Sequence, residues 1–245
     1  MARLARQISE SGLYHIVFRG VNRQRIFEEA CDYSKLRDIL IDLKEEMKYE
    51  VYAYCFMSNH VHILLKEKEM GDISLIMKRL LTKYARWYNV KYQRSGALIA
   101  NRYKSKPVEA DEYFLSIVRY IHQNPTRAQV TNNIEDYEWS SYKEYTKENK
   151  GLCDKFFVFD MMTKKEFIEF HKKEEESTFS VDDRIKISDD EIRRKILRKI
   201  NIEPKQIGEL EKNKRDEILK ALKSEFSIRQ LERVTGISRG VIYKS

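Results

Sequence analysis

Two histidines, one residue apart, lie in the stretch CFMSNHVHILL, which covers residues 55–65. The apolar residues around them predict a largely buried β-strand. Successive side chains of a strand point to opposite faces, so His60 and His62 share one face and Val61 points away from it. Two imidazoles on one face can bind one divalent ion. The alternative is a polar sheet face that happens to carry two histidines, but burying two rings without a partner is costly, which favours the metal site.

The elements that must position these histidines follow from the hydrophobic pattern. Alternation of apolar and polar residues predicts strands, and apolar residues three or four apart predict helices. In chain order we expect a strand over 12–22, a helix over 32–49, a hairpin of 51–57 and 60–66 with its turn at Ser58 and Asn59, a helix over 72–92, an extended segment over 98–110, and a helix that starts near Asp111 with Pro125 just beyond its end. Since this order lacks regular βαβ alternation, it predicts an α+β fold, an antiparallel sheet with helices packed on it.

The composition restricts the kind of partner and the compartment. The 245 residues include 47 Lys and Arg against 39 Asp and Glu, a net charge of +8, and the pI is about 9.2. This balance suggests a polyanionic partner, nucleic acid first. The three cysteines are far apart and form no CxxC pair, which favours a reducing cytoplasm over a disulfide framework or a zinc ribbon. No run of 18 apolar residues occurs, so we expect no membrane contact.

The character of the chain changes after about residue 148. We expect residues 149–184 to form a charged connector with a short helix near 163–176, and residues 185–245 to form a small all-helical domain. Its last stretch, SIRQLERVTGISRGVIYKS, resembles a helix-turn-helix in which Gly236 makes the left-handed turn and Ser238 caps the second helix. Such a helix places its first side chains in the major groove of DNA, which makes Arg239 a candidate DNA contact. A generic helical hairpin is the alternative.

The histidine stretch resembles the signature of the HUH endonucleases, a histidine, a hydrophobic residue and a histidine. It is closer still to that of the single-tyrosine transposases of the insertion-sequence type and their REP-associated relatives. Four further segments also resemble the family, and they occur along the chain in the family's order: YHIVFRGVNRQRIF (14–27), RYKSKPV (102–108), RYIHQNPTRA (119–128) and WSSYKEY (139–145). The resemblance covers roughly residues 10–147 and implies a ferredoxin-like HUH/RRM-like sandwich for a transposase domain over 1–148. LIANRYKS departs from the family, whose members usually carry a glycine before the arginine; the departure affects a DNA-contacting loop.

The resemblance also implies a reaction. Members cut single-stranded DNA with a tyrosine that forms a 5′-phosphotyrosine and releases a 3′-OH, while Mg²⁺ or Mn²⁺ polarises the phosphate. Among 15 tyrosines, Tyr120 matches the catalytic position, and Tyr113, one heptad earlier, is the alternative. Asn124 lies four residues after Tyr120, shares its helix face and offers an oxygen that suits a hard cation. The family's third ligand is a polar amide at this offset. Alternatively, Asn124 caps the helix before Pro125.

Two basic segments offer DNA contacts. They are RGVNRQR, with Arg19, Arg23 and Arg25, and NRYKSK, with Arg102, Lys104 and Lys106 around Tyr103, whose ring could stack on an unpaired base. The resemblance implies single-stranded or hairpin DNA as the partner and a nucleoid-associated location in the cytoplasm. It leaves a monomer and a homodimer open.

We therefore expect a metal-dependent transposase that cleaves and rejoins single-stranded DNA near hairpins. One alternative is a DNA-binding regulator with an inactive HUH site. Another is an RNA-binding module, because a basic α+β sandwich also suits RNA. The joint presence of His60, His62, Tyr120 and Asn124 favours catalysis over the regulator. Cleavage of RNA needs no phenolate, because the 2′-OH can attack, which counts against the RNA module.

Overall fold

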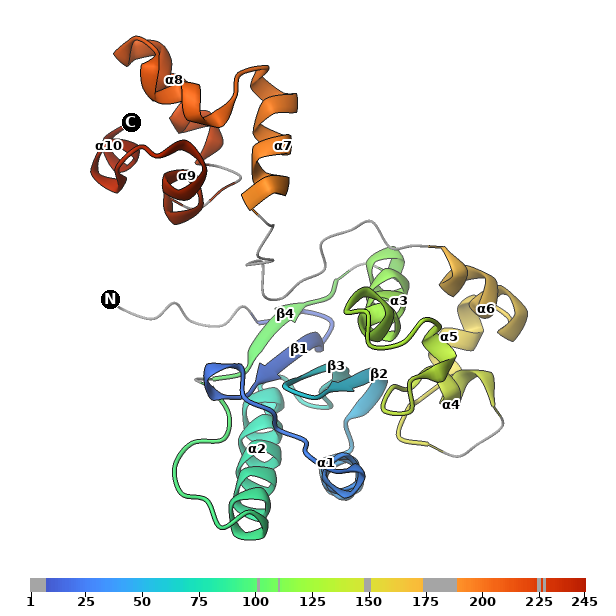
Figure 1. The fold of residues 1–245 in the computed structure, drawn as a ribbon. Coiled ribbons are helices and arrows are strands. Elements are labelled where there is room, and N and C mark those ends of the chain that lie inside the picture. The colour runs from blue at the N-terminus through green and yellow to red at the C-terminus, as the bar shows by residue number, and fades with distance from the viewer. Residues whose placement is uncertain are drawn as a thin grey trace. The chain divides into compact units, whose positions relative to one another are not determined.

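The computed structural model describes residues 8–100, 102–109, 111–147, 151–173, 189–223, 226 and 228–245 (Figure 1). Its contacts divide the chain into two compact units, Met1–Asp183 and Arg184–Ser245. Each unit has a hydrophobic core of its own. Among the described residues, no helix is both long enough and apolar enough to cross a bilayer.

The first unit is built on a four-stranded sheet in the order β2-β3-β1-β4, with every neighbouring pair antiparallel. The strands are β1 (Leu13–Arg19), β2 (Glu50–Met57), β3 (His60–Lys66) and β4 (Lys104–Pro107). The β1–β3 register pairs Val17 with His62 and Arg19 with His60. Because side chains alternate, His15, Val17 and Arg19 share the sheet face of the two β3 histidines.

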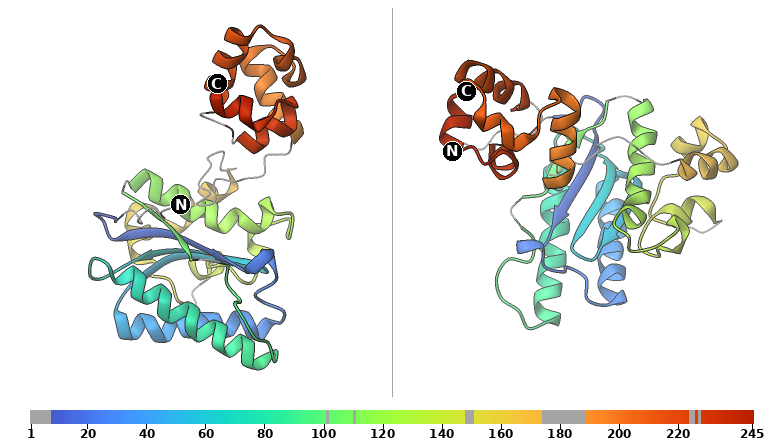
Figure 2. Two further views of the ribbon diagram at one scale, coloured as in Figure 1. Left: turned by 90° about the vertical axis from the view of Figure 1, so that its left-hand side faces the viewer. Right: turned by 45° about the horizontal axis from the view of Figure 1, so that its top comes forward.

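Helices cover both faces of this sheet (Figure 2, left). Helices α1 (Ala30–Met47) and α2 (Asp72–Lys91) pack side by side on one face. The opposite face, which carries the histidines, is covered by α3 (Asp111–Arg127), whose Tyr120 contacts His62. Burial on both faces explains why β2 and β3 read as nearly continuous apolar runs. The fold is thus the predicted α+β arrangement, with an all-helical C-terminal unit.

The predicted elements agree with the structure except around prolines and loops. The hairpin turns at Ser58 and Asn59 as expected, and the helices predicted over 32–49 and 72–92 are α1 and α2. The extended segment predicted over 98–110 contains only the four-residue β4. Helix α3 runs past Pro125 to Arg127 rather than ending before it. A proline in the last turn removes one N–H donor and leaves the earlier turns of the helix unchanged.

The segment predicted as a charged connector over 149–184 contains the expected short helix, but its described part packs into the first unit. Residues 151–173 form α5 (Phe156–Met161) and α6 (Lys164–Lys172), which follow η2 (Ile134–Asp136) and α4 (Tyr142–Thr146). Leu152, Val158 and Phe167 are buried in the core of the first unit. The many charged residues of this segment favoured a solvated connector, although the apolar residues between them face inward. Residues 174–184 of the predicted connector lie outside the described residues, and the predicted domain boundaries remain a prediction.

A buried pair of histidines fastens α6 to α3. The Nδ1–H of His171 donates to the carbonyl of Phe167 at 2.8 Å, so its Nε2 must accept the Nδ1–H of His122 at 2.9 Å. The Nε2 of His122 then accepts the hydroxyl of Ser141 at 2.7 Å, and this hydroxyl oxygen accepts the backbone N–H of Tyr54 in β2 at 2.9 Å. This chain of neutral groups ties α3 to the sheet and to α6. The side chain of His122 is fully buried.

The C-terminal unit consists of α7 (Asp189–Ile200), η3 (Pro204–Glu209), α8 (Lys212–Leu222), α9 (Ile228–Thr235) and α10 (Arg239–Lys244). Gly236 has φ +76° between α9 and α10, as the left-handed turn requires, and Ser238 precedes α10 without a side-chain capping bond. Leu231, Val234, Ile237 and Ile242 form the core between these helices, as their spacing predicts.

All five histidines are held neutral by burial, which lowers each pKa from its ordinary value of about 6.5, and that of His171 to about 4. Below pH 6.5 the unfolded chain therefore binds protons that the folded chain does not. The stability that the neutral histidines contribute should be fully present above pH 6.5. The free energy of unfolding should fall as the pH drops towards 4, with about 3 kcal/mol of the loss due to His171. Urea denaturation of the wild type and of His171→Gln at pH 7 and pH 4.5 tests this. The variant should lose less stability between the two pH values, and equal losses would contradict the expectation.

Candidate active site

The imidazoles of His60 and His62 meet on the sheet face beneath α3, with ring centroids 5.1 Å apart. Each has its Nδ1 atom engaged by a neighbour. His60 Nδ1 lies 2.7 Å from Asn59 Oδ1, which can only accept, and His62 Nδ1 lies 3.0 Å from Nε2 of His15. The Nε2 atoms are thus the ones that both rings can offer to a cation. This arrangement fits a metal site built on two histidines.

Both histidines are in the protonation state that ligates metal. Burial, followed by the nearby charge of Arg19, lowers the pKa of His60 to about 4. Burial also holds the pKa of His62 well below its usual range, with smaller contributions from His15, His60 and Arg19. A neutral imidazole keeps a lone pair for a cation, whereas a protonated one has none. Near neutral pH, no proton has to leave before an ion binds.

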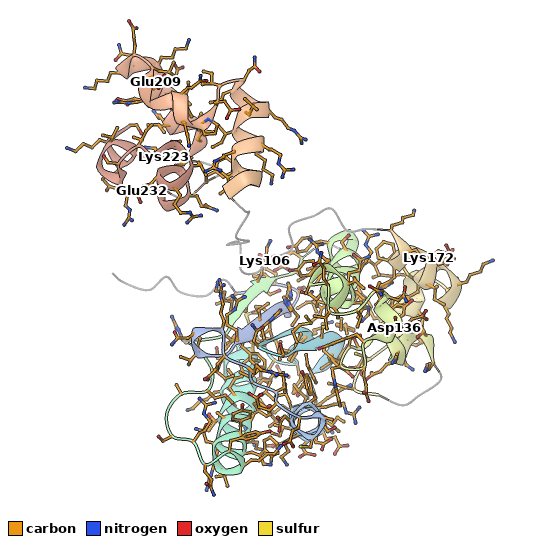
Figure 3. The ribbon with its side chains drawn as sticks, viewed as in Figure 1. Lys106, Asp136, Lys172, Glu209, Lys223 and Glu232 are labelled. Atoms are coloured by element: carbon orange, nitrogen blue, oxygen red, sulfur yellow. The ribbon has the colours of Figure 1, made fainter. Side chains whose placement is uncertain are left out.

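Tyr120 is the tyrosine that α3 brings to these histidines. Its side chain is 9% exposed, and its ring lies edge-on to His62 at 5.8 Å and to His15 at 5.9 Å. The guanidinium of Arg127 lies 5.2 Å from the Tyr120 ring, and Arg19 interacts with Tyr120 electrostatically. By contrast, the ring of Tyr113 lies 5.3 Å from Nζ of Lys106 on β4, which Figure 3 labels.

Asn124 is half-buried one turn after Tyr120, and its side-chain amide faces backbone carbonyls of α3 next to Pro125. Its Nδ2 donates to the carbonyl of Tyr120 at 2.8 Å and lies 3.5 Å from that of Ile121, the acceptor for which Pro125 has no N–H. The amide oxygen of Asn124 is thereby left as its acceptor for a cation. Asn124 does not cap the helix end, since α3 continues to Arg127. No group of three His, Cys, Asp or Glu suited to a metal occurs within the described ranges, so a third ligand of another type, such as this amide, would be needed.

The residues predicted to contact DNA have different environments. Arg23, Arg25, Arg102 and Lys104 are exposed, whereas Arg19 and Lys106 are half-buried. Burial and Arg23 lower the pKa of Arg19, while Tyr120 acts to raise it. Arg25 pairs with Glu28 at 3.5 Å, and Arg239 of α10 pairs with Glu232 of α9 at 2.5 Å. Tyr103 is 7% exposed and belongs to the core. The prediction that its ring stacks on a base is therefore corrected, because the ring face is covered.

His15 is the member of this cluster that sequence reasoning missed as a site residue. The alternation in β1 placed His15 opposite to Tyr14 and Ile16. Only the β1–β3 register, which sets Val17 against His62, shows that His15 is diagonal to His62 on one face. The guanidinium of Arg119, the residue before Tyr120, lies 4.0 Å from the centroid of the Phe170 ring and donates to the Phe170 carbonyl.

Comparisons with known proteins agree with this fold. The family model described as "Transposase IS200 like" matches residues 9–124. A Haemophilus influenzae protein assigned by name to the REP-associated tyrosine transposases is 25% identical over 154 residues, which are 58% of this chain and 86% of the relative. A solved structure of a REP-associated tyrosine transposase bound to a REP hairpin shares the fold, with a TM-score of 0.50 at 17% identity over 59% of this chain and 84% of that one. These findings confirm the resemblance, and the part of the chain that matches the IS200-like transposase model, residues 9–124, includes both histidines, Tyr120 and Asn124.

Proposed function

We propose that the first unit cleaves and rejoins single-stranded DNA near hairpins, with Tyr120 as the nucleophile. The observation that carries this proposal is the contact of the Tyr120 ring with His62, whose Nε2 is neutral and faces away from its hydrogen-bond partner. The relative of known structure that shares the fold was solved with a REP hairpin, which supports hairpin DNA as the substrate class.

In the proposed step, the Tyr120 oxygen forms a bond to the scissile phosphorus and the bond from phosphorus to the 3′ oxygen breaks. The phenol loses its proton and the leaving 3′ oxygen gains one, so the products are a 5′-phosphotyrosine and a 3′-OH. Arg127 and Arg19 lie where their positive charge favours the phenolate over the phenol. Since the number of phosphodiester bonds is unchanged, a 3′-OH can attack the phosphotyrosine and rejoin the strand.

His60, His62 and Asn124 would hold the Mg²⁺ or Mn²⁺ ion. When bound, such an ion would withdraw electron density from the phosphate oxygens and ease attack by Tyr120. The chain prepares the three ligands in advance, since Asn59, His15 and the α3 backbone engage the other polar atom of each side chain. The intact set favours this function over a regulator with an inactive site.

The DNA strand would be guided by the basic residues beside the site. Arg19, Arg23 and Arg25 follow the end of β1, and Arg102, Lys104 and Lys106 belong to β4 and the segment before it. Contacts to phosphate position the strand without reading its sequence.

The C-terminal unit would add affinity for DNA, because it carries nearly all of the net charge. Residues 184–245 contain 17 Lys and Arg against 10 Asp and Glu, a net charge of +7, whereas residues 1–183 contain 30 against 29, a net charge of +1. On α7, Ile192 and Ile196 face the core while Arg194, Lys195, Arg198 and Lys199 are exposed in two adjacent i,i+4 rows. Such a basic stripe suits the phosphate backbone of DNA.

The metal site is tested by calorimetry with Mn²⁺. We expect the wild type to bind one ion, and we expect His60→Ala combined with His62→Ala to abolish binding, because both Nε2 ligands are removed. His171→Gln, which changes a buried histidine outside the site, should bind the ion like the wild type. Unchanged affinity in the double variant would exclude this site.

The charge of the C-terminal unit is tested by ending the chain at residue 183, since an end near residue 150 would remove Leu152, Val158 and Phe167 from the core. The shortened chain should still cleave a hairpin substrate, but it should bind more weakly. Its plot of log affinity against log salt should be shallower, by about 0.9 for each duplex phosphate that the unit neutralises in the full chain. Arg194→Gln, Lys195→Gln, Arg198→Gln and Lys199→Gln together should reproduce part of this change in the full chain. If truncation leaves both affinity and salt slope unchanged, the unit has another role.

The nucleophile is tested by Tyr120→Phe, with Tyr113→Phe as the matched control. The first change removes one oxygen and keeps the ring, so stability should change by about 1 kcal/mol or less, while hairpin binding persists. The covalent adduct with DNA should vanish from a denaturing gel in Tyr120→Phe and persist in Tyr113→Phe. Mass spectrometry that locates the adduct on Tyr113 would show that the assignment is wrong.

A further inference from the structure

His15 is a buried histidine that lies between the two groups of the proposed reaction. Its side chain is fully buried on β1. Its Nε2 lies 3.0 Å from Nδ1 of His62, and its ring meets Tyr120 at a centroid distance of 5.9 Å. Burial lowers the pKa of His15 to about 3, so the ring is neutral. A buried, neutral imidazole that touches both a candidate ligand and a candidate nucleophile calls for a reason beyond core packing.

The reason follows from where the protons must be. A neutral imidazole has one N–H and one lone pair. If His62 offers the lone pair of its Nε2 to a cation, its proton must be on Nδ1, the atom that faces His15. Nε2 of His15 must then be the acceptor of that proton, and the proton of His15 itself is on Nδ1.

The remaining atom of His15 agrees with a specialised role. Within the described part of the chain, Nδ1 of His15 has no hydrogen-bond partner, although it is buried. A histidine that served only to fill space would be better replaced by an apolar residue, because the unpaired polar atom costs free energy. The hydrogen bond between His62 and Nε2 of His15 therefore accounts for an imidazole at this position.

We propose that His15 is a positioning residue of the metal site. It accepts the Nδ1–H of His62, and it thereby fixes both the ring orientation of His62 and the tautomer whose Nε2 lone pair faces the cation. It touches neither the cation nor the DNA. The inference rests on the proposed function, since it assigns a role at the site of His60, His62 and Asn124.

The test compares Mn²⁺ affinity in two substitutions of His15 by calorimetry. His15→Leu removes the acceptor and should weaken binding about 10- to 100-fold, the usual effect of losing a hydrogen bond to a metal-bound histidine. His15→Gln places an amide oxygen at about the reach of Nε2 and should restore affinity to within a few-fold of the wild type. His171→Gln makes the same exchange at the other buried histidine pair, with a nitrogen–nitrogen distance of 2.9 Å, and should leave affinity unchanged. Wild-type affinity in His15→Leu, or affinity in His15→Gln as weak as in His15→Leu, would overturn the role.

A second measurement decides the question on the unaltered chain if the His15 variants do not fold. In ¹⁵N-histidine NMR spectra of the protein with Mg²⁺, His62 should carry its proton on Nδ1 and not on Nε2. The opposite tautomer, or ligation through Nδ1, would overturn the inference. Failure of the proposed function gives a different result, since His60→Ala would then bind Mn²⁺ as tightly as the wild type.

Discussion

The antiparallel register between β1 and β3 is the constraint on which the candidate site depends. It places Val17 opposite His62 and Arg19 opposite His60, so that His15, Arg19 and the two β3 histidines share one face. If β3 shifted its register by one residue, both histidines would move to the face covered by α1 and α2. Val61 and Ile63 would then turn towards Tyr120. The register is protected because both faces are buried. The apolar residues Ile16, Phe18, Val61 and Ile63 are buried against the other layer and have no alternative place.

The second requirement is that α3 keeps its position and rotation above this face. The bonds from His171 through His122 and Ser141 to the backbone of β2 hold the helix on the side away from the site, and Tyr120 and Asn124 lie on the side towards it. One side of α3 therefore carries the polar groups that hold the helix in place, and the other side carries the polar groups of the candidate site. Its last turn survives Pro125 because the Asn124 amide donates to the carbonyl of Tyr120 and approaches that of Ile121. One side chain thus stabilises the helix end with its nitrogen, while its oxygen is the atom suited to a cation.

Local patterns were sufficient for what depends on neighbours in sequence, and insufficient for what depends on the packing of distant segments. The hairpin of β2 and β3, the helices α1 and α2, and the pair His60 and His62 all follow from alternation or helical spacing within one segment. His15 could not be connected to His62 without the strand order, because 47 residues separate them. Phe167 and His171 could not be placed in the core, because the lysines and glutamates around them are typical of a solvated connector. Tyr103 lies among basic residues, which suggested a base-stacking role, yet its ring is buried in the core of the first unit.

Under the proposed function, the distribution of charge would separate attraction of the DNA from the chemistry. Near Tyr120 the positive charge is local and specific, since Arg127 lies against its ring and Arg19 is half-buried at the end of β1. The first unit as a whole is nearly neutral, so a long-range field cannot be its main attraction for a polyanion. The net charge of the chain resides instead in residues 184–245, and much of it is exposed on one face of α7. Phosphate contacts there would be sensitive to salt, whereas the buried imidazoles and the half-buried Arg19 are screened much less by dissolved ions. Under the proposed function, the C-terminal unit would govern how often DNA is bound, and the register of β1 with β3 would govern what happens to a bound strand.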